Sequence, residues 1–141
     1  MDNRLLGIAK KAGFLEIGEE SVATAARNKK AKVILSAADA SDGSKRRART
    51  YAEQYNITYL ILPSTKEDLG AVVGRGAPGM LAILDAGIAS RYADMLARLE
   101  PGQYDTEAET LSKMAQRVLQ RRREARAHDR NKRTGKRRTG L

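Results

Sequence analysis

Residues 18–39 constrain the fold of this chain more than any other stretch, because they predict a turn, a helix and a buried strand in direct succession. Gly18 permits a tight entry into the helix, and the two glutamates after it place negative charge at the positive end of the helix dipole. Small and apolar residues continue the helix over 19–27, and an apolar run rich in β-branched residues follows at 32–36. Because that run is apolar on both faces, it predicts a central strand.

The same alternation of helices and strands extends over most of the chain. Further helices are predicted from a cap at Asp2 to a stop at Gly13, over 45–55, from a Ser64–Glu67 or Thr65–Asp68 capping box to Val73, and from Ile88 to a stop before Pro101. Further strands are predicted at 15–17, which is short and suits an edge, at 58–62, which suits a central position, and at 80–84. This order predicts an α/β protein, a three-layer α/β/α sandwich with a four-stranded mixed sheet.

Composition divides the chain into three parts. The compact domain is predicted to span 1–102 and to end at Pro101-Gly102. Residues 103–120 are predicted to form an appended amphipathic helix that packs on its own domain or on a partner, with an apolar stripe of Leu111, Met114, Ala115 and Val118. Residues 121–141 are predicted to be a basic, disordered tail, because so charged a segment cannot form a core.

The net charge of +10 is distributed unevenly. Residues 1–105 hold 15 Lys+Arg against 13 Asp+Glu, a net of +2, whereas 106–141 hold 12 against 4, a net of +8. Such asymmetry indicates a polyanionic partner, either nucleic acid or an acidic membrane surface, and the lack of apolar anchors in the tail disfavours a membrane. A smaller basic cluster, interpreted as a solvated helix face, consists of Lys45, Arg46, Arg47 and Arg49.

Several classes of protein are disfavoured by what the sequence lacks. There is no cysteine, which excludes disulfides and thiolate metal sites, and the single histidine, His128, makes imidazole ligation of zinc improbable. No metal and no cofactor are therefore predicted. The N-terminus lacks the apolar run of a secretory signal, and no later stretch approaches membrane length. We expect a soluble, cytoplasmic protein that is monomeric when free.

The order of motifs resembles the kink-turn-binding ribosomal protein family, the ribosomal L7Ae type, and within it the small stand-alone bacterial branch. The motifs are the Gly-Glu-Glu helix start, Ala-Lys-Val-Ile-Leu-Ser-Ala-Ala-Asp-Ala-Ser at 31–41, Leu-Gly-x-x-x-Gly at 69–74 and Leu-Ala-Ile-Leu-Asp-x-Gly at 81–87. The resemblance covers about 3–100. It implies an α/β/α sandwich that binds structured RNA, typically at the sheared G·A pairs of a kink-turn, through residues 18–24 and 74–79.

The sequence departs from the family signature at the positions that contact RNA. The family pattern Gly-x-Asn-Glu-x-x-Lys falls on residues 18–24, where the asparagine is replaced by Glu20, the glutamate by Ser21 and the lysine by Thr24. The predicted RNA-contacting residues of the domain are Gly18, Glu19, Glu20, Ser21, Thr24, Lys29, Lys30, Arg75, Gly76, Ala77 and Pro78. Those of the tail are Arg121, Arg122, Arg123, Lys132, Arg133, Lys136, Arg137 and Arg138.

No catalytic constellation is recognisable in the sequence. The loop at 74–79 lacks the Gly-Lys-Ser/Thr ending of a phosphate-binding loop, and the adjacent acids Glu19 and Glu20 point in different directions from a helix. We therefore predict no enzyme. The leading hypothesis is an RNA-binding protein of the translation apparatus that binds structured RNA, such as rRNA or the ribosome. The alternative is a protein-interaction module that has lost specific kink-turn recognition.

Overall fold

Four short strands form a mixed sheet in the order β1–β4–β2–β3. The computed structural model describes residues 2–74 and 76–134. The strands are β1 (Leu15–Ile17), β2 (Val33–Ser36), β3 (Thr58–Ile61) and β4 (Met80–Ile83). β4 is antiparallel to both β1 and β2, with Ala82 opposite Glu16 on one side and Ile34 on the other, whereas β3 is parallel to β2. The predicted mixed four-stranded sheet is thus confirmed.

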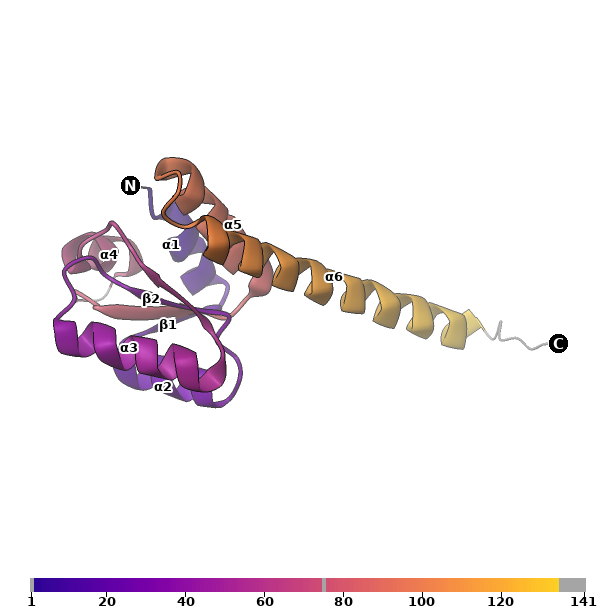
Figure 1. Cartoon of the computed structure of the whole chain (residues 1–141). Coiled ribbons are helices and arrows are strands. Elements are labelled where there is room, and N and C mark those ends of the chain that lie inside the picture. Colours follow the sequence, from indigo (N-terminus) through magenta and orange to yellow (C-terminus); the bar gives the residue numbers. More distant parts are fainter. Residues whose placement is uncertain (1, 75, 135–141) are drawn as a thin grey trace.

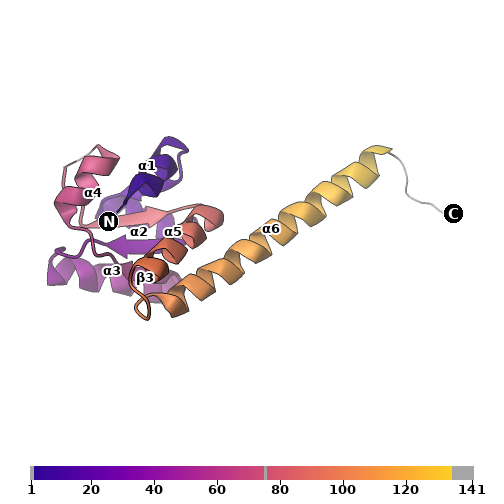
Figure 2. The ribbon, with the colours of Figure 1, turned by 90° about the horizontal axis from the view of Figure 1, so that it is seen from above.

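Helices cover both faces of the sheet, as the sandwich prediction requires (Figures 1 and 2). They are α1 (Arg4–Lys11), α2 (Glu19–Arg27), α3 (Asp42–Tyr55), α4 (Lys66–Val73), α5 (Ala86–Leu99) and α6 (Asp105–Thr134). A core of small side chains under α2 and α3 includes Val22, Ile34 and Ala48, and a larger core on the other face includes Leu6, Leu35 and Tyr92. Neighbouring strand residues alternate between these two cores, as the pleat of a sheet dictates.

β3 is an edge strand, so its predicted central position is wrong. Its apolar sequence led to that prediction, but β4 enters the sheet between β1 and β2, and β3 is left with one neighbour. Only Leu60 of this strand is buried, and Ile61 is 39% exposed. α6 packs against β3 and covers part of its apolar surface, where a central strand would have a second neighbouring strand.

Helix starts differ from the predicted ones where a polar side chain has a choice of partners. Asp2 Oδ1 accepts from the Arg4 amide at 2.9 Å, as predicted for a capping side chain, although the N-cap position itself is Asn3. The Asn3 amide instead bonds Ser64 Oγ at 3.0 Å and accepts from the Tyr92 hydroxyl at 3.1 Å. Burial raises the pKa of Tyr92, which keeps that hydroxyl protonated as a donor. α3 begins at Asp42, three residues earlier than predicted, because Ser41 Oγ accepts from the Ser44 amide. α4 uses the Thr65–Asp68 capping box.

α6 is a single helix of 30 residues that continues 14 residues past the predicted end at 120 (Figure 1). Its first turns pack against α5, with Leu111 fully buried, so the helix docks on its own domain. The prediction of a disordered segment from 121 onward is wrong for 121–134. The docked turns supply the costly helix nucleus, and the following Arg, Ala and Glu residues propagate a helix at little cost. The sequence holds no Gly or Pro between Gly102 and Gly135.

Candidate RNA-binding surface

Three segments distant in sequence meet at one end of the sheet: the start of α2, the loop 74–79, and the connection from β2 to α3. The Gly18 amide donates to the Met80 carbonyl at 2.9 Å, and the Ala37 amide donates to the Gly79 carbonyl at 3.0 Å. These two bonds tie the loop to both neighbours. The structure therefore brings together the two segments, 18–24 and 74–79, that the sequence analysis assigned to one surface. Arg75 lies outside the described residues.

Glycines shape this surface at two points. Gly18, the N-cap of α2, has φ +94° and offers no side chain to the first helical amides, which leaves these donors available to an anion. Gly79 is packed closely: a Cβ there would meet Ala40 Cβ at 3.5 Å and Ser44 Oγ at 3.6 Å. Within the described part of the loop, Gly76 and Ala77 are exposed and have no long side chain, so the loop presents its backbone at these two residues.

Glu19 is used inside the protein. Its carboxylate accepts two hydrogen bonds from Arg47 Nε, at 2.8 and 3.0 Å, and a third from the Tyr51 hydroxyl at 2.8 Å. The Tyr51 bond, followed by the Arg47 bond and charge, lowers the pKa of Glu19, and the same bond raises the pKa of Tyr51. Glu19 thus joins α2 to α3, and its charge at this surface is compensated by the guanidinium.

The other predicted residues of α2 face outward on a separate side of the helix. Glu20, Ser21 and Thr24 line a shallow hollow together with Glu16 of β1. Thr24 Oγ1 donates to the Glu20 carbonyl one turn earlier, so this hydroxyl is turned back onto its own helix. Two carboxylates, Glu16 and Glu20, line this hollow against the single cation of Lys30, so the hollow is a poor match for phosphate.

Positive side chains from other elements surround the loop instead. Lys45 Nζ donates to the Ala38 carbonyl at 2.7 Å, Lys66 Cδ lies 3.8 Å from the position of a Cβ on Gly79, and Lys10 Nζ donates to the Val73 carbonyl. Arg46, in the first turns of α3, is exposed. From the sequence, Lys45 and Arg46 were interpreted only as a solvated helix face, and Lys10 and Lys66 were missed. Lys45 follows the end of β2 and Lys66 the end of β3, and the ends of these two parallel strands lie at the same end of the sheet, which could have indicated that both lysines lie there.

The remaining predicted RNA contacts lie elsewhere, so the structure divides the predicted set. Lys29 and Lys30 follow the C-terminus of α2, at the end of the sheet opposite Gly18. The cations 121–134 belong to α6, which runs antiparallel to α5, passes Asp85 with Arg122 Nη2 at 3.9 Å, and projects beyond the domain (Figure 2). Arg121, Arg123 and Lys132 are exposed on this helix. Lys136, Arg137 and Arg138 lie outside the described residues, and of Arg133 the structure describes only the backbone.

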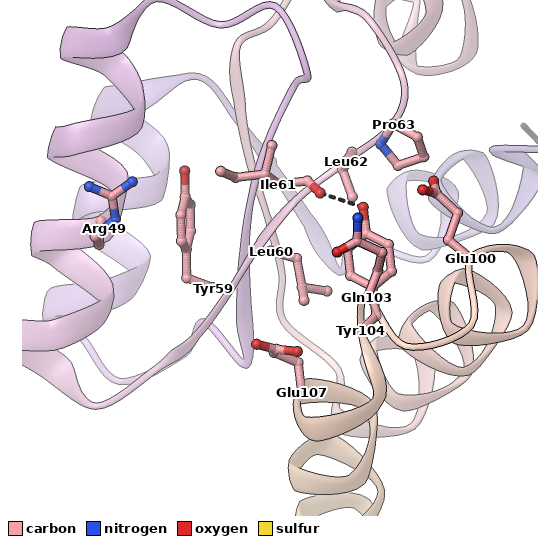
Figure 3. Close-up of a pocket in the computed structure, with 10 residues that line it drawn as sticks. All are labelled: Arg49, Tyr59, Leu60, Ile61, Leu62, Pro63, Glu100, Gln103, Tyr104 and Glu107. Carbon is pink, nitrogen blue, oxygen red and sulfur yellow. Dashed lines mark hydrogen bonds between the residues drawn. The ribbon is translucent and has the colours of Figure 1, made fainter.

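A second hollow runs along the free edge of β3, between α3 and the start of α6 (Figure 3). The Arg49 guanidinium carbon lies 6.0 Å from the centroid of the Tyr59 ring, and the Tyr104 hydroxyl donates to the outward carbonyl of Ile61 at 2.7 Å. Burial, with smaller contributions from Glu100 and Glu107, raises the pKa of Tyr104. The Tyr104 bond closes part of the strand edge, while the segment around Tyr59 stays accessible.

Among residues 2–74 and 76–134, no group of three or more His, Cys, Asp or Glu side chains is arranged to hold a metal ion. None of the helices in the same ranges combines the length and apolar character needed to cross a membrane.

The fold and this surface define a class of small α/β/α sandwich in which a helix N-terminus and a glycine-rich loop meet at one end of the sheet. The sequence model of the "Ribosomal protein L7Ae/L30e/S12e/Gadd45 family" matches residues 3–92. The chain belongs to this family. α6 lies outside the matched residues.

Curated relatives and solved structures agree with this assignment. Two proteins named "RNA-binding protein YlxQ", from Bacillus subtilis (strain 168) and Enterococcus faecium, are each 30% identical over 92 residues, which is 65% of this chain and 91% and 87% of theirs. A protein of unknown function from Bacillus halodurans C superposes with a TM-score of 0.60 at 26% identity, over 64% of this chain and 91% of that chain. The Giardia lamblia 15.5kD RNA binding protein shares the fold, with a TM-score of 0.54 at 16% identity, over 69% and 82%.

Proposed function

We propose that this protein is a non-enzymatic, cytoplasmic RNA-binding protein of the translation apparatus, monomeric when free, which binds structured RNA such as rRNA. The observation that carries the proposal is the meeting of the α2 N-terminus with the loop 74–79 in an L7Ae-family fold. The uncapped amides in the first turn of α2 and the surrounding Lys45, Arg46 and Lys66 supply donors and positive charge for a phosphate backbone. Relatives in the same family are named as RNA-binding proteins.

α6 is proposed to supply most of the electrostatic affinity. Residues 121–141 carry ten Lys+Arg against two Asp+Glu, a net of +8, and the described part of this segment is a helix that extends into solvent. A helix holds its cations at fixed spacing along a phosphate backbone, whereas a disordered tail must be ordered on binding. The domain surface then selects the shape of the RNA, and α6 adds affinity that depends little on sequence.

The domain surface is tested by restoring the family signature. The triple variant Glu20→Asn, Ser21→Glu, Thr24→Lys should raise affinity for a kink-turn RNA duplex by more than its added charge explains, because the asparagine regains a donor for base edges. The matched control adds the same net charge of +1 at the opposite end of the sheet, by the single substitution Gln54→Lys at an exposed position near the C-terminus of α3. Equal gains from both variants would refute an RNA site at the start of α2.

A second candidate function, protein interaction, is favoured by the accessible edge of β3. A peptide strand could add beside Tyr59 and Ile61, where the sheet lacks a neighbour. Tyr59→Pro would remove an outward backbone donor and block such addition while leaving the RNA surface intact. If this variant, shown to be folded by circular dichroism, kept RNA affinity but lost a co-purifying protein, the interaction module would become the leading function.

A further inference from the structure

We propose a second nucleotide-binding site at the end of the sheet opposite the loop 74–79, in which Phe14 stacks on one unpaired base and Lys29, Lys30 and Lys32 bind the adjoining phosphates. We call it the lysine groove and define it by its lining: Gly13, Phe14, Lys29, Lys30, Lys32 and Leu84. It rests on the proposed function only in taking RNA as the class of ligand. It lies at the end of the sheet opposite Gly18 and shares only Lys30 with the hollow beside Glu20.

Three chain segments hold the lysine groove in shape. The Leu84 amide donates to the Phe14 carbonyl at 2.8 Å, and the Lys32 amide donates to the Ile83 carbonyl at 2.8 Å. The turn before β1, the turn before β2 and the end of β4 are thereby fixed to one another. The hollow between them measures about 340 Å³, within the range of about 300–1,000 Å³ that small-molecule sites occupy. It is therefore large enough for a ligand group rather than only water.

The lining combines a solvent-accessible ring with positive charge that is not already compensated. Phe14, the only phenylalanine in the chain, is 40% exposed. Within the described residues, none of Lys29, Lys30 and Lys32 takes part in an ion pair. Lys30 also lines the neighbouring hollow, which contains the carboxylates of Glu16 and Glu20, whereas the described lining of the lysine groove itself holds no carboxylate. An aromatic face beside several cations is the arrangement by which proteins bind unpaired nucleotides.

The backbone at Lys29 adopts a conformation that usually belongs to glycine. The Lys30 amide donates to the Ala25 carbonyl at 2.9 Å and the Lys29 amide to the Ala26 carbonyl at 3.1 Å, which is a Schellman ending of α2. The residue at the left-handed position of this motif is usually glycine, but here it is Lys29, with φ +59°. The turn therefore places a cation beside the groove at a small cost in backbone energy that glycine would avoid.

The lysine groove also lies next to the point at which α6 leaves the domain. Leu84 of the groove precedes Asp85, and Asp85 is the residue beside which Arg122 passes. A strand whose phosphates contact Lys29 and Lys32 can therefore continue toward the cations of α6. The scarcity of other exposed aromatic side chains limits stacking to one base, so the ligand is an unpaired nucleotide flanking a structured RNA rather than a long single strand.

The test uses the full chain and one kink-turn duplex RNA prepared with and without a short unpaired uridine extension. Wild-type protein should bind the extended RNA more tightly. Phe14→Leu keeps an apolar side chain but removes the ring. It should reduce the ratio of affinities for the extended and the blunt RNA about fivefold at every salt concentration. Lys29→Gln with Lys30→Gln should lower the slope of log K against log salt by about 1.4, the value for two single-strand phosphate contacts. Arg91→Gln with Arg98→Gln, on exposed positions of α5, is the control of equal charge.

Lys29→Gly separates binding from folding. It should raise the midpoint of thermal unfolding, because glycine relaxes the left-handed turn, and yet weaken binding of the extended RNA. The proposal is overturned if Phe14→Leu binds both RNAs as wild type does. It is also overturned if Lys29→Gln with Lys30→Gln changes the slope of log K against log salt no more than the α5 control does. A third contrary result is an acidic peptide that displaces the extended RNA equally from wild type and Phe14→Leu. Failure to bind the blunt duplex would contradict the proposed function alone, because the gain from the extension is measured separately.

Discussion

The two ends of this molecule carry positive charge in different ways. At one end, the surface around Gly18 is assembled from three segments joined by backbone hydrogen bonds, and its cations come from separate elements. At the other end, α6 is one continuous helix that carries its described cations from Arg121 onward on a single stretch of sequence and projects beyond the domain (Figure 2). The first surface can recognise shape, because its geometry is fixed by tertiary contacts. The second carries its charge along a helix that extends past the domain, so its cations can reach phosphates that lie too far from the first surface to contact it.

This difference teaches how a family fold can lose signature residues and still act on the same class of ligand. The residues at the Asn, Glu and Lys positions of the signature, which are Glu20, Ser21 and Thr24, offer no cation to phosphate. If α6 compensates through counterion release, affinity and selectivity are supplied by separate parts of the chain. Each can then be removed without the other, and the four predictions below run from the largest expected effect to the smallest.

Removing residues 121–141 should have the largest effect on RNA affinity. The deletion takes away a net charge of +8, and if four of these cations contact phosphate, the slope of log K against log salt should fall by about 3. Titrations of one structured RNA at several salt concentrations measure the slope for both chains. Preserved discrimination between a kink-turn and a plain duplex is expected, since the surface around Gly18 is untouched. An unchanged slope would mean that α6 contributes no phosphate contacts and that the comparison fails.

Truncating the anchor of α6 should destabilise the domain. Leu111 is fully buried against α5, so Leu111→Ala should lower the free energy of unfolding by about 2–5 kcal/mol. Leu119, on the same helix but 43% exposed, provides the control, and Leu119→Ala should change it by about 0.5 kcal/mol or less. Urea unfolding gives both values. Amide exchange across 108–114 should become faster in the first variant only; similar costs for both would contradict docking of α6 through Leu111.

Asn3 links the elements behind the surface around Gly18. Its amide bonds Ser64 and Tyr92, both buried, so Asn3→Ala should cost about 1–3 kcal/mol by leaving the Tyr92 hydroxyl without its acceptor. The neighbouring Asp2 is exposed and, among the described residues, bonds only the side chain and the amide of Arg4, so Asp2→Ala should cost less, because it removes only an exposed cap. Thermal unfolding distinguishes the two variants. A stable Asn3→Ala protein would show that this end of the domain tolerates a buried unsatisfied group.

Glu19 should give the smallest effect, visible only as a dependence on pH. Its folded pKa is lowered, chiefly by Tyr51 and then by Arg47, so the carboxylate stabilises the fold above its unfolded pKa of about 4.3. That contribution is lost as the pH falls through the folded value. Glu19→Gln should therefore be less stable than wild type near neutral pH, and the difference should vanish in acid. A difference that is the same at every pH would exclude the ion pair as its cause.

Much of the fold follows from local patterns. The helices and strands were predictable from apolar periodicity and capping residues, and the Thr65–Asp68 capping box and the short β1 were placed correctly. Two errors share one origin, since β3 as a central strand and 121–134 as disordered were both judged from local composition. An apolar strand can be covered by helices at an edge, and a charged segment can stay helical when a docked helix precedes it. Neither the cover of β3 by helices nor the docking of α6 can be inferred from the local sequence.

The sequence by itself determined the order of elements, the two apolar faces of the sheet and the concentration of charge after residue 120, because each follows from residue type and spacing. Only the tertiary structure decided that Lys29 and Lys30 lie at the end opposite Gly18, that Glu19 is bonded to Arg47, and that Phe14 meets three lysines. The physical reason is the strand order β1–β4–β2–β3. Because β4 runs antiparallel between β1 and β2, the ends of β1 and β2 meet the start of β4 at one end of the sheet, and their starts meet the end of β4 at the other. This arrangement is set by packing between segments far apart in the chain rather than by any residue's immediate neighbours.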